Sequence, residues 1–361
     1  MTATHLADDA IQLTTVRVRH IKLAVSLAVV TVLLALLFAL VPRDGQSTFR
    51  LGDPASDIDL GSVAVPTAVT SWSVLVLLVL LTAWSVWDAV GYRRTPLWLP
   101  IAFGALAVFA FLVWAAADGL VPVTGLLFGA LSLSVPLIFG ALGGVIGERV
   151  GVVNVAIEGQ FLFGAFSAAL VASLTRNPFL GLVAAMVGGV LVAFVLAAFS
   201  IKYLVDQVIV GVVLNVLVTG LTGFLYGALL VPNEDVLNRP ERFPRIEIPL
   251  LGDIPIIGPV LFNQTFIVYL MYAVVAVVAW GLYRTRWGLR LRAVGEHPKA
   301  ADTVGIKVNS SRFWNVSLAG AIAGIGGAYF TLVSVGQFTK EMTAGLGFIA
   351  LAAVIFGRWD P

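Results

Sequence analysis

Long apolar stretches separated by shorter polar segments follow one another along this chain. A helix needs about 20 apolar residues to cross the hydrocarbon core of a membrane, and most of these stretches are that long. The pattern predicts spans at residues 21–41, 71–90, 98–117, 124–146, 158–175, 180–200, 208–230, 264–283 and 313–335. A shorter apolar run at 341–356 fits either a tilted span or a re-entrant segment. We therefore expect about ten membrane segments.

Composition supports this interpretation. Of the 361 residues, 59% are hydrophobic and only 12% are charged, which is far from the average of a soluble globular domain. The predicted fold class is an all-α, polytopic transmembrane helical bundle. The first apolar run is too long for a signal-peptide core and lacks an A-x-A cleavage site, so we interpret it as a retained first span. The absence of cysteine excludes disulfides and thiolate metal sites.

The basic residues flank the apolar runs, which is typical of topology signals and not of a nucleic-acid-binding face, despite the net charge of +2. With a cytoplasmic N-terminus and alternating spans, fifteen of the 22 Lys and Arg lie inside. They are Arg17, Arg19, Lys22, Arg93, Arg94, Arg149, Lys202, Arg284, Arg286, Arg290, Arg292, Lys299, Lys307, Arg312 and Arg358. This excess has the sign of the positive-inside rule and predicts a multi-pass membrane protein with a cytoplasmic N-terminus.

Two predicted loops on the other side are long. The loop at 43–70 is acidic, with Asp44, Asp53, Asp57 and Asp59. The loop at 232–263 carries a proline every few residues, which prevents a continuous helix, so we expect a rigid extended cap over the outer mouth. The alternative is that both loops are featureless connectors. The chemically unusual residues begin after residue 120, so we divide the chain into N-terminal extra spans at 1–120 and a core at 121–361.

A polar break, GERVGVVNVAIEGQ at 147–160, lies between two long apolar runs. Ionisable groups at membrane depth cost several kcal/mol, so they line a path, pair with each other or contact a partner. The break therefore points to transport. We assign Asn154 and Gln160 to a substrate path. Glu148, Arg149 and Glu158 are predicted to be structural, with Glu158 capping or pairing locally, for instance with Arg149.

The run 208–230 carries a polar stripe. Spacings of three and four put its members on one helix face, which must meet protein or water and not lipid. We assign Asn215, Thr219 and Thr222 to the substrate path; the alternative for Asn215 is a single hydrogen bond between helices. The full stripe is Gly211, Asn215, Thr219, Thr222 and Tyr226.

Two further stripes of small residues are predicted to be packing seams, because small side chains let helix backbones approach closely. One lies in 313–335 and the other in 124–146. They are Ser317, Gly320, Gly324, Gly327, Thr331 and Ser334, and Ser132, Pro136, Gly140 and Gly144.

The polar loop at 284–312 contains a short predicted helix, His297 to Val304, with Pro298 in the first helical position. Such a short helix needs a docking surface on the same chain or on a partner. An ordinary positive-inside loop is the alternative. No P-loop, H-E-x-x-H site or G-x-S-x-G elbow is present, so we expect neither an enzyme nor a bound metal or cofactor.

Four segments resemble the permease subunits of bacterial ATP-binding-cassette importers, in the subgroup that handles nucleosides and simple sugars. They are GERVGVVNVAIEGQFLFGAF (147–166), DQVIVGVVLNVL (206–217), WGLRLRAVGEHPKAADTVGIKV (287–308) and MTAGLGFIALAAVIFGRWDP (342–361). The resemblance covers roughly residues 120–361. It implies a location in the bacterial plasma (inner) membrane. It also implies cytoplasmic ATPase subunits, a second permease subunit in a homo- or heterodimer, and an extracytoplasmic solute-binding lipoprotein.

The resemblance also implies that the loop at 284–312 docks on the ATPase. The matching residues are Gly295, Glu296, His297, Pro298, Lys299 and Asp302. Relatives continue beyond the motif that ends at Asp360 and Pro361, so we expect the chain to be truncated at its C-terminus.

Three other functions remain open. Permeases for branched-chain amino acids belong to the same broad group. An ion-coupled secondary transporter would need titratable residues deep in its spans, whereas Asp88, Asp118 and Asp206 fall near span ends. A membrane scaffold is disfavoured by the polar stripe on 208–230.

Overall fold

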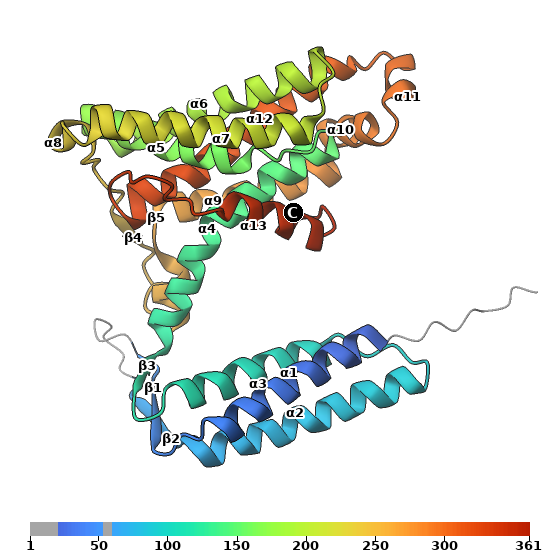
Figure 1. Cartoon of the computed structure of the whole chain (residues 1–361), viewed down its shortest axis with the longest axis vertical. Coiled ribbons are helices and arrows are strands. Elements are labelled where there is room, and N and C mark those ends of the chain that lie inside the picture. Colours follow the sequence, from blue (N-terminus) through green and yellow to red (C-terminus); the bar gives the residue numbers. More distant parts are fainter. Residues whose placement is uncertain (1–20, 53–59) are drawn as a thin grey trace, which may run out of the picture. The chain divides into compact units, whose positions relative to one another are not determined.

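The computed structural model describes residues 21–52 and 60–361 (Figure 1). Arg17 and Arg19 of the topology prediction, and Asp53, Asp57 and Asp59 of the first long loop, lie outside these residues. The chain divides into two compact units, residues 1–124 and residues 125–361.

The first unit packs three helices around an apolar core that includes Leu27, Phe38, Leu78 and Phe103. The helices are α1 (Ile21–Leu40), α2 (Thr67–Val90) and α3 (Trp98–Ala115). A small sheet closes one end, with β1 (Gln46–Arg50) between antiparallel β2 (Ser62–Pro66) and parallel β3 (Leu120–Pro122). The buried Ser47 hydroxyl donates to the carbonyl oxygen of Val113 at 2.6 Å and ties the sheet to α3. The first long loop is therefore not a featureless connector.

The second unit consists of helices long enough to span a membrane, connected by turns and short elements at both ends. Its long helices are α4 (Val123–Arg149), α5 (Ile157–Thr175), α6 (Pro178–Ala197), α7 (Gln207–Leu225), α9 (Phe266–Arg284) and α12 (Val308–Tyr329). Its shorter elements are α8 (Glu234–Leu237), α10 (Arg286–Glu296), α11 (Pro298–Thr303), α13 (Leu346–Phe356), strands β4 (Arg245–Glu247) and β5 (Asn263–Thr265), and π-helical turns η1 (Ala198–Lys202), η2 (Tyr226–Leu230), η3 (Gly258–Phe262) and η4 (Phe330–Ser334).

The described residues contain nine helices long and apolar enough to cross a membrane, and the shorter α13 follows them. The prediction of an all-α bundle with about ten membrane segments is confirmed, with boundaries shifted by a few residues. Two spans are interior, because 72% of α5 and 89% of the span that begins with α12 are buried, against at most 44% of any other span. The exposed faces of the other spans are apolar, as contact with lipid requires.

Glycine contacts hold the interior helices together. A Cβ atom on Gly164 of α5 would lie 2.7 Å from the carbonyl oxygen of Gly324 on α12. One on Gly189 of α6 would lie 2.0 Å from the carbonyl oxygen of Gly320. In α4, a Cβ on Gly140 would lie 2.5 Å from the ring of Phe161. The glycines of both small-residue stripes therefore lie in packing seams, as predicted.

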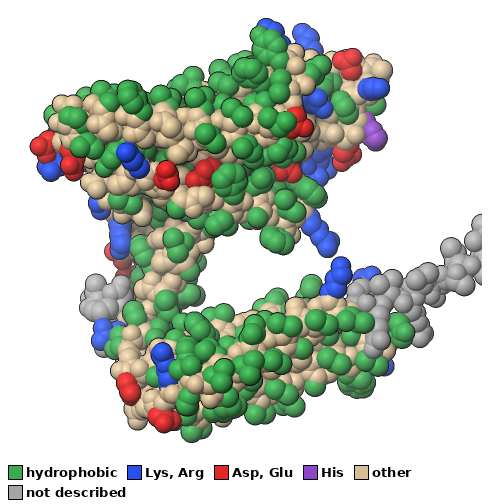
Figure 2. All heavy atoms as spheres, in the orientation of Figure 1, with side chains coloured by type: hydrophobic (Ala, Val, Ile, Leu, Met, Phe, Trp, Pro, Cys, Tyr) green, Lys and Arg blue, Asp and Glu red, His purple; other side chains and the backbone are tan. Residues whose placement is uncertain are grey.

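The two ends of the second unit carry different structures. In the space-filling view hydrophobic side chains are spread over its helices, and charged side chains are most frequent near its ends, with some along one edge between them (Figure 2). At the β4–β5 end, the buried Asn238 bonds to both backbone groups of Phe338, accepting from N–H at 2.7 Å and donating to the carbonyl at 3.0 Å. The proline-rich loop is thus folded onto the turn after η4 and is not a featureless connector. The other end is formed by α10 and α11 (Figure 1).

Candidate functional site in the polar turn between α4 and α5

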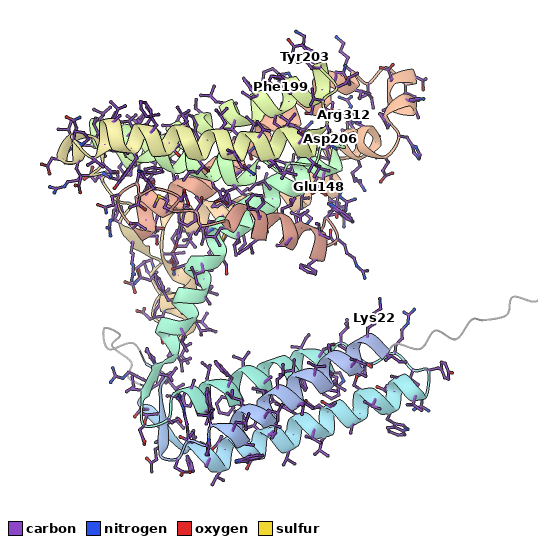
Figure 3. The ribbon with its side chains drawn as sticks, in the orientation of Figure 1. Lys22, Glu148, Phe199, Tyr203, Asp206 and Arg312 are labelled. Carbon is purple, nitrogen blue, oxygen red and sulfur yellow. The ribbon has the colours of Figure 1, made fainter. Side chains whose placement is uncertain are left out.

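The polar segment 147–160, called the polar turn below, connects two complete spans. Helix α4 ends at Arg149, and Gly151 reverses the chain with a φ of +84°. The N–H of Val152 donates back to the carbonyl of Gly147 at 2.9 Å, which closes the turn. Glu148 lies at the end of the second unit where Asp206 and Arg312 also lie (Figure 3). The segment is therefore a turn at the edge of the bundle and does not split a span into two halves.

Asn154 and Gln160 bind each other. The amide of Asn154 donates to Gln160 Oε1 at 2.9 Å, and the amide of Gln160 donates to Asn154 Oδ1 at 3.3 Å. Both side chains are fully buried. This reciprocal pair joins the extended end of the polar turn to the first turn of α5.

Asn215 fastens α7 to the polar turn. Its Oδ1 accepts from the N–H of Gly159 at 2.8 Å, and its amide donates to the carbonyl of Val155 at 2.9 Å. Gln207 at the start of α7 adds a bond from the N–H of Val153 to its Oε1 at 3.1 Å. The geometry of Asn215 matches the interhelical hydrogen bond that the sequence left as the alternative to a path residue.

The rest of the polar stripe also faces protein. Thr222 is buried and donates to the carbonyl of Val218 at 2.7 Å within its own helix. Thr219 is half-buried, and its hydroxyl has no hydrogen-bond partner among the described residues. Val212 and Val216, on the opposite face, are exposed. The shared face predicted for the stripe is confirmed, and it points away from lipid.

Glu158 is buried on α5 and binds the N-terminus of α13. Its Oε1 accepts from the hydroxyl of Thr343 at 2.5 Å and from the N–H of Gly345 at 2.9 Å. Its Oε2 accepts from the N–H of Gly347 at 2.7 Å. Helix α13 has no capping side chain of its own. The carboxylate of Glu158, from another helix, accepts from its free N–H groups and interacts favourably with the positive end of the helix dipole.

The suggested pairing of Glu158 with Arg149 is wrong. The guanidinium of Arg149 donates instead to the carbonyl of Trp359, at 3.0 and 3.2 Å. The indole N–H of Trp359 donates to Glu148. Glu158 is the second residue of α5, where Thr343, Gly345 and Gly347 supply its hydrogen-bond donors. The ligands of Glu158 were missed because the apolar run 341–356 offered only the glycines of Gly345-Leu346-Gly347 as a signal.

The segment α10–α11 packs against the same turn. A Cβ atom on Gly295 would lie 2.2 Å from the carbonyl oxygen of Arg149, so the two backbones are in direct contact. Arg312 at the start of α12 donates to the carbonyl of Val150 at 3.3 Å. The polar turn therefore contacts the α10–α11 segment on one side and α7 and α13 on the other.

The short helix predicted in the polar loop is present as α11, with Pro298 in its first turn. Only Ala301 of this helix is buried. Four of the predicted coupling residues are exposed, and within the described residues none of their side chains has a hydrogen bond or an ion pair. They are Glu296, His297, Lys299 and Asp302.

Comparison with known proteins decides the family. Residues 126–361 match the family described as the permease component of the branched-chain amino acid transport system. The chain belongs to this family. The permease is thus a transport component. Its polar turn and the helices α7, α11 and α13 all lie inside the matched region.

Three relatives illustrate the likeness. The guanosine ABC transporter permease protein NupQ of Bacillus subtilis is 40% identical over 238 residues, which is 64% of this permease and 74% of the relative. The nucleoside ABC transporter permease protein NupC of Lactococcus lactis is 40% identical over 239 residues, with the same coverage of 64% and 74%. The putative glucose ABC transporter permease protein TsgC13 of Haloferax volcanii is 37% identical over 241 residues, or 66% and 71%. No solved structure matches the permease.

Proposed function

We propose that this permease imports nucleosides or simple sugars as the membrane subunit of an ATP-driven transporter. The observation that carries the proposal is the 40% identity to the guanosine and nucleoside permeases. The likeness covers 238 residues, about the length of the second unit. The second unit contains every element around the polar turn. The 37% identity to the putative glucose permease supports sugars as the second solute class.

The partners follow from the same assignment. ATPase subunits would bind the α10–α11 segment, where the charged side chains of Glu296, Lys299 and Asp302 are exposed and unpaired within the described part of the chain. A second permease subunit and an extracytoplasmic solute-binding lipoprotein would complete the importer. ATP would then be hydrolysed on a separate chain.

In this proposal the polar turn transmits movement from α11 to the spans. The contact of Gly295 with the carbonyl of Arg149 passes a displacement of α10 to the end of α4. Asn215 and Glu158 then couple the turn to α7 and α13. Asn154, Gln160 and Asn215 stabilise the polar turn through their hydrogen bonds. Thr219, with its half-buried hydroxyl, is the member of the stripe that we propose faces the substrate path.

We place the α10–α11 end in the cytoplasm, together with the N-terminus of the chain. The support is the concentration of basic side chains at that end, which the positive-inside rule associates with the cytoplasm. Examples are Arg286, Arg290, Lys307 and Arg312. The first unit then supplies N-terminal extra spans in addition to a permease core at 121–361.

An ion-coupled carrier is less well supported. Such a carrier needs an accessible titratable group inside its spans. Glu158 lies inside a span, but both of its oxygens are bonded to Thr343, Gly345 and Gly347 of the same chain. A branched-chain amino acid as solute rests on the family description alone.

Transport by the reconstituted complex tests the proposal. The permease is placed in liposomes with its ATPase, second permease and binding protein, and uptake of labelled guanosine, glucose and leucine is followed with ATP inside. We expect ATP-dependent uptake of guanosine or glucose and none with an ATPase that cannot hydrolyse ATP. Uptake of leucine alone, or uptake driven by an ion gradient without ATP, would contradict the proposal.

A further inference from the structure

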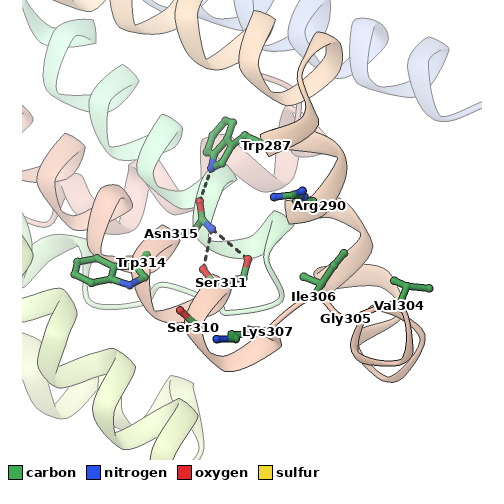
Figure 4. Close-up of a pocket in the computed structure, with 10 residues that line it drawn as sticks. All are labelled: Trp287, Arg290, Val304, Gly305, Ile306, Lys307, Ser310, Ser311, Trp314 and Asn315. Atoms are coloured by element: carbon green, nitrogen blue, oxygen red, sulfur yellow. Dashed lines mark hydrogen bonds between the residues drawn. The ribbon is translucent and has the colours of Figure 1, made fainter.

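A cavity of about 520 Å³ opens between α10 and the start of α12 (Figure 4). Neither Glu158 nor Asn215 lines it. Its wall includes Trp287 and Arg290 from α10 and Lys307, Ser310 and Trp314 from the start of α12. Both ionisable side chains in this wall, Arg290 and Lys307, are cationic. The cavity is therefore suited to an anion.

The donors around this cavity are free. Among the described residues, no hydrogen bond or ion pair engages the guanidinium of Arg290, the ammonium of Lys307 or the hydroxyl of Ser310. The first turn of α12 also lacks a capping side chain, since Lys307 occupies the N-cap position. Free N–H groups and the positive end of the helix dipole add to the attraction for an anion. These groups favour a ligand with several acceptor oxygens.

The aromatic wall is fixed in place. The indole N–H of Trp287 donates to Asn315 Oδ1 at 2.9 Å, and the amide of Asn315 donates to the carbonyl of Ser311 at 2.7 Å. The ring of Trp287 packs on Gly281 of α9, where a Cβ atom would lie 3.0 Å from the ring. The cavity is thus preformed by contacts that do not involve Arg290 or Lys307.

The surroundings of the cavity are apolar and exposed. Trp314 in the wall is 64% exposed, and Leu318, one turn further along α12, is 42% exposed. Because α9 and α12 are spans, their ends at α10 lie at the depth where tryptophan is enriched and where basic pockets between helices bind anionic lipid headgroups. A free phosphate would use the cations but not this apolar surface.

We propose that this cavity binds the phosphate of an anionic phospholipid headgroup. Arg290 and Lys307 donate to the phosphate oxygens, Ser310 adds a hydroxyl donor, and the acyl chains lie along Trp314 and Leu318. The site is independent of the solute that the permease carries. It anchors α10, and with it the α10–α11 segment, to one leaflet.

Lipid retention by the whole permease tests this. Native mass spectrometry of the purified chain is compared in mixtures of phosphatidylglycerol and phosphatidylcholine, for the wild type and for the double variant Arg290→Gln, Lys307→Gln. Each basic residue near an anionic surface contributes about 1 kcal/mol, so we expect phosphatidylglycerol binding to fall about tenfold or more in the variant. Binding of phosphatidylcholine should not change.

The matched control is Arg284→Gln, Arg286→Gln, which removes the same charge at the same end without altering the wall of the cavity. If the control loses as much phosphatidylglycerol binding as the double variant, the lipid is attracted by the general surface charge, and the proposed site is wrong. Full displacement of the lipid by millimolar inorganic phosphate would make it a small-anion site instead. Unchanged lipid binding with loss of the co-purifying ATPase would assign the cavity to a protein contact.

Discussion

Glu158 on α5 and Gly347 on α13 are joined by a hydrogen bond of 2.7 Å across 189 positions of sequence. The contact is also steric, because a Cβ atom on Gly347 would lie 2.4 Å from the backbone nitrogen of Glu158. A carboxylate inside the bundle therefore fixes where the short helix α13 begins. Its three hydrogen bonds satisfy both oxygens of this buried carboxylate.

Replacing Glu158 with Gln should destabilise the permease more than it changes solute preference. The side-chain amide of the glutamine would direct its own N–H donors at an N–H of α13. The substitution would also remove a charge-assisted hydrogen bond worth about 1.5–3 kcal/mol. We expect a lower unfolding temperature in nanodiscs and the same ranking of solutes in uptake. Glu234→Gln, which changes an exposed carboxylate with no described side-chain hydrogen bond, is the control. A changed solute preference with wild-type stability would instead make Glu158 a path residue.

Replacing Asn215 with Leu should also act through stability. The N–H of Gly159 and the carbonyl of Val155 would lose their partner, at about 1–3 kcal/mol for each unsatisfied group. Hydrogen bonds between membrane helices average only about 0.6 kcal/mol, so the low end of the range is the expected one. Thr219→Val is the comparison, because it removes the half-buried hydroxyl and should lower uptake without lowering the unfolding temperature. If Asn215→Leu instead lowers uptake and leaves the unfolding temperature unchanged, Asn215 lines the substrate path.

The pattern of apolar runs predicted the spans because hydrophobic length is a local property of the chain. It also located the stripe on α7, since 3.6 residues per turn sort Asn215 and Thr219 onto one face. The partners of Asn215 and Glu158 could not be predicted, because Val155 and Gly347 contribute backbone groups that any residue possesses. The small sheet around β1 was missed for a similar reason, as its strands pair across distant parts of the chain.

Replacing Gly324 with Ala should prevent correct packing of the interior. The added methyl carbon would lie 2.2 Å from the carbonyl oxygen of Ala185, and backbone atoms cannot move aside as a flexible side chain can. We expect a large loss of folded protein in size-exclusion chromatography. Gly220→Ala on α7 is the matched control, since nothing lies within 4 Å of its added Cβ. Equal yields of the two variants would show that the α6–α12 contact is looser than described.

Replacing Glu296 and Lys299 together with Ala should uncouple ATP hydrolysis from uptake or release the ATPase. Both side chains are exposed and bear no described hydrogen bond, so the fold should be unaffected. Binding at α11 must differ between the two states of the ATPase for coupling to occur. Co-purification and uptake per ATP hydrolysed are the measurements, with Glu234→Ala at the β4–β5 end as control. Normal values of both would show that these two side chains are dispensable.

Replacing Gly295 with Ala should separate coupling from ATPase binding. The new methyl carbon would lie 2.2 Å from the carbonyl oxygen of Arg149 and 3.3 Å from the nitrogen of Gly151, so α10 must move away from the polar turn. The exposed surface of α11 is unchanged, and the ATPase should still bind. We therefore expect ATP hydrolysis and co-purification near the wild-type level with at least a tenfold loss of uptake per ATP, a change of about 1.4 kcal/mol in coupling. If uptake stays normal, the contact between Gly295 and Arg149 does not transmit the movement, and coupling must pass through another contact, such as that of Arg312 with Val150.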